Sequence, residues 1–292
     1  MSISRQNLSV IIVSFKSDHI IHRCIDSIDK EIEIIVVDNS NNAEFKKYIE
    51  DKYKNVRCIL STKNIGMGGG NNIGIKSTNK DFALVLNPDV ILEKDAINQI
   101  INASKVIDSF GVIAPTLDDV KYPNYKLDYT KDQKFDPINP FKVKSVDGYS
   151  MLLNLKKLKQ LTNFNFFDEN FFLYLENDDF CKRLQLINEN IFVVPKSKIY
   201  HLGGQAVDPK YKKEIELARN WHWMWSKFYF NKKHYGYLNA LIKNFPSLIS
   251  SKIKFFYYFL IFNTHKKMIY KMRFKGLFSS MLGKKSLYRP KI

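Results

Sequence analysis

Residues 8–15 read LSVIIVSF, a short apolar run rich in β-branched residues, which predicts a parallel strand buried on both faces. Three similar runs follow it, at Ile32–Val37, Val56–Leu60 and Phe82–Leu86. Segments with helical spacing or helix-forming composition lie between and after them, at Ile20–Ile28, Ala43–Tyr53 and Asp95–Ile107. This alternation of strands and helices predicts an α/β fold with a doubly wound, mostly parallel sheet.

The remainder of the chain divides into a mixed segment and a helical one. Residues 118–143 predict a long loop, Ser145–Asn154 a strand, Asn177–Leu186 a helix and Ile191–Val194 a short strand. Beyond Lys213 the pattern is helical almost to the end. We therefore expect an α/β domain over residues 1–205 and a helical, basic and aromatic region over residues 206–292.

Polar residues gather where the predicted strands end, the edge at which doubly wound sheets bind ligands. Ser14 and Asp38 close the first two strands, and residues 64–74 follow the third as NIGMGGGNNIG. These glycines do not satisfy GxGxxG in any register, so a dinucleotide fingerprint is not indicated. They predict a loop up to Gly70 whose backbone can approach a ligand, followed by a helix from Asn71 whose start favours anions.

A carboxylate follows the fourth strand in Asn87-Pro88-Asp89. Proline ends the strand and leaves Asp89 at the edge of the sheet. One carboxylate at such a position can hold Mg²⁺ or Mn²⁺, whose remaining ligands come from water and substrate phosphates. An Asp after a strand can equally cap a helix, so the motif alone leaves both functions open.

Three carboxylates, Glu176, Asp178 and Asp179, follow the aromatic run Phe171-Phe172-Leu173-Tyr174. A carboxylate beside an apolar wall can have a raised pKa and serve as a general base. Acidic residues are also favoured at the start of a helix, where Asp179 could pair with Arg183 one turn later. A further candidate is His201, beside Gly203 and Gly204.

The net charge of +17 is concentrated in the last third of the 292 residues. Residues 196–292 contain 21 Lys and Arg against three acidic residues, whereas residues 1–195 are nearly neutral. The basic residues alternate with Trp, Tyr and Phe, which is typical of a helix in a lipid headgroup region. A solvated basic face is the alternative. Nucleic acid is not an expected partner, because no nucleic-acid motif is present and the aromatic residues form apolar blocks.

Two classes of protein are excluded by short segments of the sequence. The longest uncharged apolar run near the C-terminus, Phe255–Phe262, is too short for the roughly 20 residues of a transmembrane helix. The N-terminal segment has no small-residue cleavage site after its apolar run, so we interpret it as a strand and not as a signal peptide. The three cysteines, Cys24, Cys58 and Cys181, are far apart in the sequence. This spacing fits a protein of a reducing compartment and argues against a structural zinc site.

Seven motifs in this order resemble the family 2 glycosyltransferases of GT-A fold, in particular their bacterial rhamnosyltransferase-like branch. They are VIIVSF, VVDNS, NIGMGGGNNIG, LVLNPDV, VDGYSMLL, FDENFFLYLENDDFCKRL and YHLGG, between residues 8 and 204. The resemblance implies that Asp38 binds the base of the donor and that Ser14 lies in the same pocket. It also implies that Asn64, Gly66 and Asn71 line the nucleotide-sugar site, and that Asp147 and Gly148 lie near the donor sugar.

The metal and base assignments also come from this resemblance. Asp89 would ligate Mg²⁺ or Mn²⁺ as the last residue of a DxD-like motif, with His201 as a second ligand or a phosphate contact. Asn87 replaces the first Asp of that motif, which leaves fewer charged ligands for the metal. Asn87 itself is expected among the donor-binding residues. The family pattern Glu-Asp-x-Asp often places the base at its first Asp, where this chain has Asn177. The base is then expected at Glu176, with Asp178 and Asp179 as alternatives.

The expected activity is inverting transfer of a sugar, with L-rhamnose from dTDP-rhamnose as the first choice of donor. The acceptor would be a hydroxyl of a glycan or lipid-linked molecule in cell-surface polysaccharide synthesis, at the cytoplasmic face of an anionic membrane. The alternatives are a UDP-hexose or galactofuranose donor, or a non-catalytic nucleotide-sugar-binding protein at the membrane surface. A nucleotidyltransferase is disfavoured, because Ser14–Ser17 contains no glycine. The sequence leaves the acceptor, the linkage and a homo-oligomeric state open.

Overall fold

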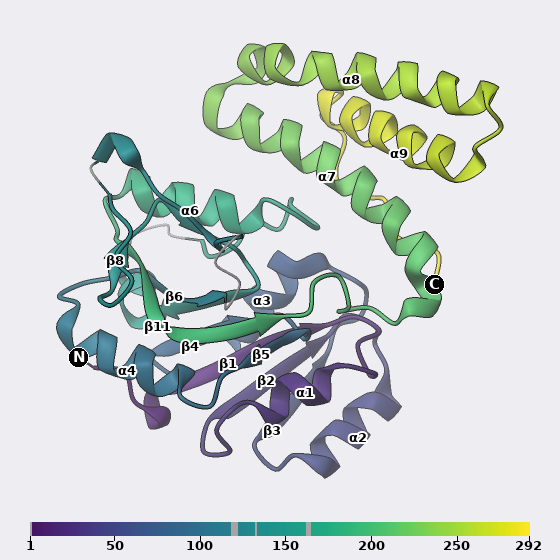
Figure 1. Ribbon diagram of the computed structural model, residues 1–292. Helices are drawn as coiled ribbons and strands as arrows, with labels where there is room; N and C mark the ends of the chain where they lie inside the picture. Colours follow the sequence, from purple (N-terminus) through teal and green to yellow (C-terminus); the bar gives the residue numbers. More distant parts are fainter. Residues whose placement is uncertain (1, 118–121, 132, 162–164) are drawn as a thin grey trace. The chain divides into compact units, whose positions relative to one another are not determined.

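The computed structural model describes residues 2–117, 122–131, 133–161 and 165–292, so the start of the predicted loop at 118–121 lies outside it. The chain divides into two compact units (Figure 1). The first contains residues 1–168 and 177–208, and the second contains residues 169–176 and 209–292. The second unit therefore includes a short segment from the middle of the chain, which the predicted boundary at residue 205 does not include.

A nine-stranded mixed sheet forms the centre of the first unit in the described part of the chain. Its main path runs in the order β3-β2-β1-β4-β10-β6-β11-β5, and β8 pairs with β11. Its strands are β1 (Leu8–Ser14), β2 (Glu33–Asp38), β3 (Val56–Leu60), β4 (Phe82–Leu86), β5 (Val90–Leu92), β6 (Val112–Leu117), β8 (Phe141–Lys142), β10 (Ser150–Asn154) and β11 (Ile191–His201). A separate two-stranded sheet pairs β7 (Tyr125–Lys126) with β9 (Ser145–Val146).

The four strands predicted first are all present, and they are parallel to one another. Strand β1 lies between β2 and β4, with Ser14 opposite Asp38 and Ile12 opposite Leu86. Strands β5 and β10 run antiparallel to their neighbours. The predicted α/β architecture is confirmed, and the carboxyl ends of β1, β2 and β4 meet at one edge of the sheet.

Helices cover both faces of this sheet (Figure 1). Val10 and Ile12 of β1 face a core shared with α1, α2 and α4, whereas Ile11 faces a core shared with α3, α5 and α6. Because successive side chains of a strand point to opposite faces of the sheet, both faces of β1 lie in apolar surroundings. The helices of this layered unit are α1 (Ile21–Asp26), α2 (Ala43–Lys52), α3 (Gly66–Lys76), α4 (Ala96–Val106), α5 (Leu155–Gln160) and α6 (Glu176–Leu186), with short 3₁₀ turns at Arg5–Asn7 and Tyr129–Lys131.

Two predicted strands differ from those observed. Ser145–Asn154 is not one strand, because the chain leaves the β7–β9 pair at Asp147 and enters the main sheet at Ser150. Strand β11 continues through Pro195 to His201, so it is longer than the predicted Ile191–Val194. A register shift between Val194 and Lys198 accommodates this irregular stretch, so that pairing with β6 resumes beyond it.

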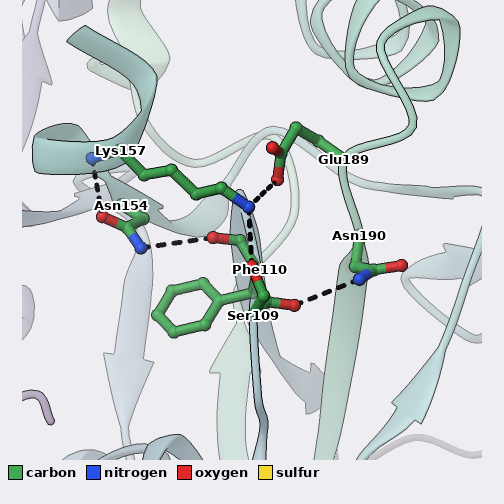
Figure 2. A network of polar contacts seen from close by, with 6 residues as sticks. All are labelled: Ser109, Phe110, Asn154, Lys157, Glu189 and Asn190. Carbon is green, nitrogen blue, oxygen red and sulfur yellow. Dashed lines mark hydrogen bonds and ion pairs between the residues drawn. The ribbon is translucent and has the colours of Figure 1, made fainter. Parts of the chain in front are cut away.

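A polar network ties together the starts of β6 and β11 and the end of β10 (Figure 2). The Lys157 ammonium donates to Ser109 Oγ and to Glu189 Oε2, both at 2.6 Å. Asn154 caps α5 and its amide also donates to the Phe110 carbonyl at 3.2 Å. These contacts fix the turn before β6 at the edge opposite the polar strand ends.

The second unit is helical, as predicted. It contains a 3₁₀ turn at Pro209–Tyr211 and three helices, α7 (Lys212–Tyr235), α8 (Tyr237–Leu260) and α9 (Thr264–Met281). Gly236 separates α7 from α8 with a φ of 85°, a conformation that favours glycine. Helix α9 packs against both α7 and α8 (Figure 1). Among the described residues no helix combines the length and the apolar character that crossing a bilayer requires.

Candidate active site

The carboxyl edge of the parallel strands brings Ser14, Asp38 and Asn39 together. Ser14 and Asp38 are register partners at the ends of β1 and β2. The Asn39 amide N–H donates to the Ser14 carbonyl at 2.8 Å, which continues the ladder one residue beyond β2. Its side-chain amide donates to the Gly66 carbonyl at 3.0 Å, so the third strand's loop joins the same edge.

Asp38 is a buried carboxylate held by backbone amides. Its oxygens accept hydrogen bonds from Ser40 N at 3.2 Å and from Asn42 N at 2.9 Å. Burial nevertheless raises the pKa of Asp38 above its usual value, because these bonds only partly offset desolvation. A buried acceptor of this kind is suited to the N–H and O–H donors of a nucleoside.

Several buried polar atoms along this edge have no hydrogen-bond partner within the described part of the chain. Buried polar groups are almost always satisfied in folded proteins, so a cluster of exceptions marks a site that a ligand or water completes. They are Ser14 Oγ, Asn39 Oδ1, Asn71 Oδ1, Asn87 Oδ1 and Asp89 Oδ1. All five belong to residues that follow or end β1, β2 and β4 or lie on α3.

Helix α3 begins at Gly66, so the prediction of a loop up to Gly70 is wrong. The Asn64 side chain accepts a hydrogen bond from Gly66 N at 3.0 Å at this start, and Gly66 has a φ of 81°. A β-carbon on Gly70 would lie 2.7 Å from Val13 Cγ1 of strand β1. The glycines therefore allow α3 to pack closely on the sheet, which carries Asn71 to the ligand edge.

Asp89 and His201 form the candidate metal site. His201 ends β11 opposite Val90, and its Nε2 lies 3.4 Å from Asp89 Oδ1. The other Asp89 oxygen accepts a hydrogen bond from Gln205 N at 3.2 Å. Asp89 is 2% exposed.

The geometry fits a divalent ion that the substrate helps to bind. A buried carboxylate oxygen without a hydrogen bond lies beside an imidazole nitrogen, which together suit Mn²⁺ or Mg²⁺. The described residues contain no group of three or more His, Cys, Asp or Glu placed to hold a metal. Asp89 and His201 alone would leave most coordination positions to water and phosphate oxygens.

Tyr149 positions His201 and belongs to the same site, although the sequence did not single it out. Its ring stacks on the His201 ring with centroids 4.1 Å apart. Its hydroxyl hydrogen-bonds to Asp147, whose backbone N–H donates to the Asn124 carbonyl at 2.8 Å. Burial raises the pKa of Asp147, which the nearby Lys126 ammonium counteracts. Tyr149 and Asn39 directly follow the predicted site residues Gly148 and Asp38 in the sequence. This adjacency is the signal that could have identified them.

Asn177 packs against the backbone of β9 and of the connection from β9 to β10. Its amide donates to the Val146 carbonyl at 3.0 Å. A β-carbon on Gly148 would lie 2.9 Å from the Asn177 β-carbon, so the two residues are in close contact. This Asn therefore shapes the segment that carries Asp147.

The three candidate bases differ in their surroundings. Asp179 is fully buried, and one oxygen pairs with Arg183 Nε at 2.9 Å. Arg183 also donates to the carbonyls of Asn165 and Phe166, so this pair links α6 to the segment before it. Asp178 is paired with Lys126 Nζ at 2.9 Å. Glu176 is the first residue of α6.

Comparisons with known proteins give a consistent family. The model of "Glycosyl transferase family 2" matches residues 9–167. The chain is 28% identical over 202 residues to the low-salt glycan biosynthesis hexosyltransferase Agl10 of Haloferax volcanii, which covers 63% of this chain and 64% of that protein. It is 25% identical over 225 residues to the rhamnosyltransferase WbbL of Escherichia coli, which covers 66% of this chain and 82% of that protein.

The fold has a solved counterpart. The mannosyltransferase PcManGT of Pyrobaculum calidifontis, determined with GDP-Man and Mn²⁺, superimposes with a TM-score of 0.55 at 11% identity. The alignment covers 97% of this chain and 89% of that one, which supports a GT-A fold. Because the family model spans more than half of the chain and the seven motifs lie on this fold, the chain belongs to glycosyl transferase family 2.

Proposed function

We propose that this protein is an inverting glycosyltransferase that moves a sugar from a nucleoside diphosphate donor to an acceptor hydroxyl. The observation that carries the proposal is the set of buried, unpartnered polar atoms at the carboxyl ends of β1, β2 and β4. Asp38 and Ser14 would bind the nucleoside, while Asn64, Gly66, Asn71 and Asn87 would line the path of the diphosphate and sugar. Asp147 and Gly148 would contact the donor sugar.

Asp89 and His201 would hold Mg²⁺ or Mn²⁺. The bound ion would neutralise charge that develops on the leaving diphosphate. Tyr149 keeps the His201 ring in place, and the Gln205 amide orients the Asp89 carboxylate. The solved mannosyltransferase with GDP-Man and Mn²⁺ supports a metal in this fold.

Glu176 is the proposed general base. It would take the proton of the acceptor hydroxyl while that oxygen bonds to the anomeric carbon and the bond from this carbon to the diphosphate breaks. Asp178 and Asp179 remain the alternatives, and Lys126 and Arg183 respectively pair with one oxygen of each.

The donor is proposed to be dTDP-rhamnose, with UDP-hexoses or UDP-galactofuranose as the alternative. The relatives support this range, because one is named a rhamnosyltransferase and the other a hexosyltransferase of glycan biosynthesis. The acceptor would be a glycan or lipid-linked molecule in cell-surface polysaccharide synthesis. The reaction would then take place at the cytoplasmic face of the membrane.

The first experiment measures thermal shifts with dTDP, UDP, GDP and CMP, each with and without Mg²⁺ or Mn²⁺. A metal-dependent shift with dTDP supports the deoxysugar donor, and one with UDP moves the donor to the alternative. Asp89→Asn should weaken the metal-dependent part of nucleotide binding at least about tenfold, since it removes the charged ligand. Asp95→Asn, an exposed acid of the same unit, is the matched control. Equal metal dependence in both variants would remove Asp89 from the site.

The base assignment is tested by Glu176→Gln in a transfer assay with the donor found above. We expect kcat to fall by about 10²–10⁴-fold while nucleotide binding is unchanged, because only proton removal is lost. The exposed Glu31→Gln is the control. Full activity of Glu176→Gln would reject this base, and nucleotide binding without transfer by the wild-type protein to any acceptor would favour the non-catalytic alternative.

A further inference from the structure

Helix α8 presents a continuous apolar stripe to solvent. At about 100° per residue, its members fall within an arc of about 80° on one side of the helix. They are Leu238, Ile242, Phe245, Ile249, Ile253, Phe256 and Leu260, all of them exposed. Ile242 and Leu260 are 76% and 70% exposed, and a contiguous exposed apolar stripe of this kind marks an interaction surface.

The opposite, buried side of α8 is less apolar than its exposed side, the reverse of an ordinary surface helix. Its buried residues are mostly small or polar, namely Ala240, Asn244 and Ser251, together with Leu248. These small residues let α8 pack closely on α9, in the cluster that contains Leu277. Most of the larger apolar side chains of the helix, apart from Leu248 and Leu241, therefore lie on the face that no other part of this unit covers.

Charge identifies what would cover that face. Residues 217–292 contain 16 Lys and Arg and no Asp or Glu. Lys243 and Lys254 flank one side of the stripe and Lys252 flanks the other, and all three are exposed. At the end of the helix, Phe259, Ile261 and Phe262 are exposed as well, with Phe262 92% exposed at the turn into α9.

We propose that the exposed face of α8, with the turn at 259–262, is an interfacial anchor that inserts in the plane of an anionic lipid surface. The stripe would enter the acyl boundary, and the flanking lysines would extend to the lipid phosphates. The helix is about 36 Å long at 1.5 Å per residue, so it offers an extended line of contact. Helix α9 and the inner face of α8 would remain outside the lipid.

A second copy of the chain fits this face less well than lipid. Two copies meeting through α8 would bring together two surfaces that each lack acidic residues, and their like charges would repel. Lipid phosphates offer the opposite charge and an apolar layer beneath it. The anchor is independent of the transfer reaction, and its test uses no donor or acceptor.

The test is flotation of the full chain with neutral phosphatidylcholine vesicles and with vesicles containing about a third phosphatidylglycerol. We expect binding to the anionic vesicles that weakens several-fold in high salt, and much weaker binding to the neutral ones. The triple variant Ile242→Ser, Ile249→Ser, Ile253→Ser should bind roughly tenfold or more weakly, since these exposed residues contribute only where they enter lipid. Circular dichroism verifies its helix content.

The matched control replaces three exposed apolar residues of the other unit, as Val106→Ser, Leu186→Ser, Ile187→Ser. It should float like the wild type. Equal flotation of the α8 variant and the wild type would overturn the proposal, as would a wild type that binds neither vesicle. A wild type that is dimeric by light scattering, binds no vesicle and becomes monomeric in the α8 variant would assign the face to a second copy.

Discussion

His222 is a neutral, buried side chain on α7 that holds the C-terminal segment. Its ring nitrogens contact Ser286 Oγ at 3.0 Å and the Tyr288 carbonyl at 2.8 Å. The pKa of His222 is lowered to about 3, chiefly by burial and also by the Arg289 charge, while the Tyr288 hydrogen bond acts in the opposite direction. In the unfolded chain a histidine titrates near 6.5. The folded state therefore binds fewer protons than the unfolded state between these two values.

From this difference we predict that stability is lost as the pH falls from about 6.5 toward 3. His222→Gln should lower the free energy of unfolding at pH 7.5 by roughly 1–3 kcal/mol, because one hydrogen bond and some packing are lost. It should also reduce the decline toward pH 4.5, measured as the thermal midpoint across pH. The exposed His19→Gln is the control. Parallel pH profiles for wild type and His222→Gln would contradict the prediction.

At the scale of elements, α3 shows a helix whose composition disagrees with its structure. Gly66, Gly68, Gly69, Gly70 and Gly74 lie on it, although each glycine in a helix costs up to about 1 kcal/mol relative to alanine. The close contact with β1 explains Gly70 and Gly74, because a β-carbon at these positions would overlap Val13 and Ile11 respectively. Helix propensity and packing therefore act in opposite directions here.

We predict that Gly70→Ala destabilises the protein by about 1–3 kcal/mol despite its better helix propensity, because its new methyl group overpacks against Val13. In a double-mutant cycle with Val13→Ala, measured by denaturation, the two effects should not add. The free energy of unfolding of the double variant should exceed the value expected from the sum of the single effects by about 1 kcal/mol or more. Lys76→Ala, on the exposed side of the same helix, should change stability by less than about 0.5 kcal/mol. Additive single effects would show that this contact does not limit packing.

The elements also show what the sequence could and could not predict. Buried runs such as Leu8–Ser14 and Phe82–Leu86 are local signals, and so the strands and the polar residues at their ends were found correctly. The start of α3 was missed because a run of glycines predicts a loop, whereas the contact of Gly70 with Val13, more than fifty residues away, is a tertiary one. Likewise, Asn177 is in close contact with Gly148, and the sequence does not show that these two residues are neighbours. The catalytic and binding roles of the edge residues remain predictions.

At the scale of the whole molecule, the chain passes between the two units at residues 168/169, 176/177 and 208/209. The segment 169–176 supplies aromatic residues to the second unit. Phe171 meets Tyr229 edge-on with centroids 4.8 Å apart, and Arg289 lies 3.6 Å over the Phe172 ring. The Ser226 hydroxyl donates to the Leu173 carbonyl at 2.9 Å. The second unit is therefore completed by a segment from the middle of the sequence.

Truncation after Asp208 should therefore damage the remaining chain. We predict that it exposes Phe171 and Phe172, increases the fluorescence of a hydrophobic dye several-fold and promotes aggregation. Adding Phe171→Ser and Phe172→Ser to the truncated chain should reverse most of the dye binding. A truncated chain with wild-type dye binding and solubility would show that these rings need no cover. Substitutions on α8 are for this reason a cleaner test of membrane binding than truncation.

Because residues 169–176 pack within the second unit, they are synthesised before the residues that cover them. Phe172 leaves the ribosome well before His222 and Arg289, the residues that contact its ring. At about 5–20 residues per second, the roughly 117 residues from Phe172 to Arg289 take about 6–23 s to synthesise. For that interval the nascent chain carries an aromatic segment that its partners from the second unit do not yet cover, a natural binding point for a chaperone.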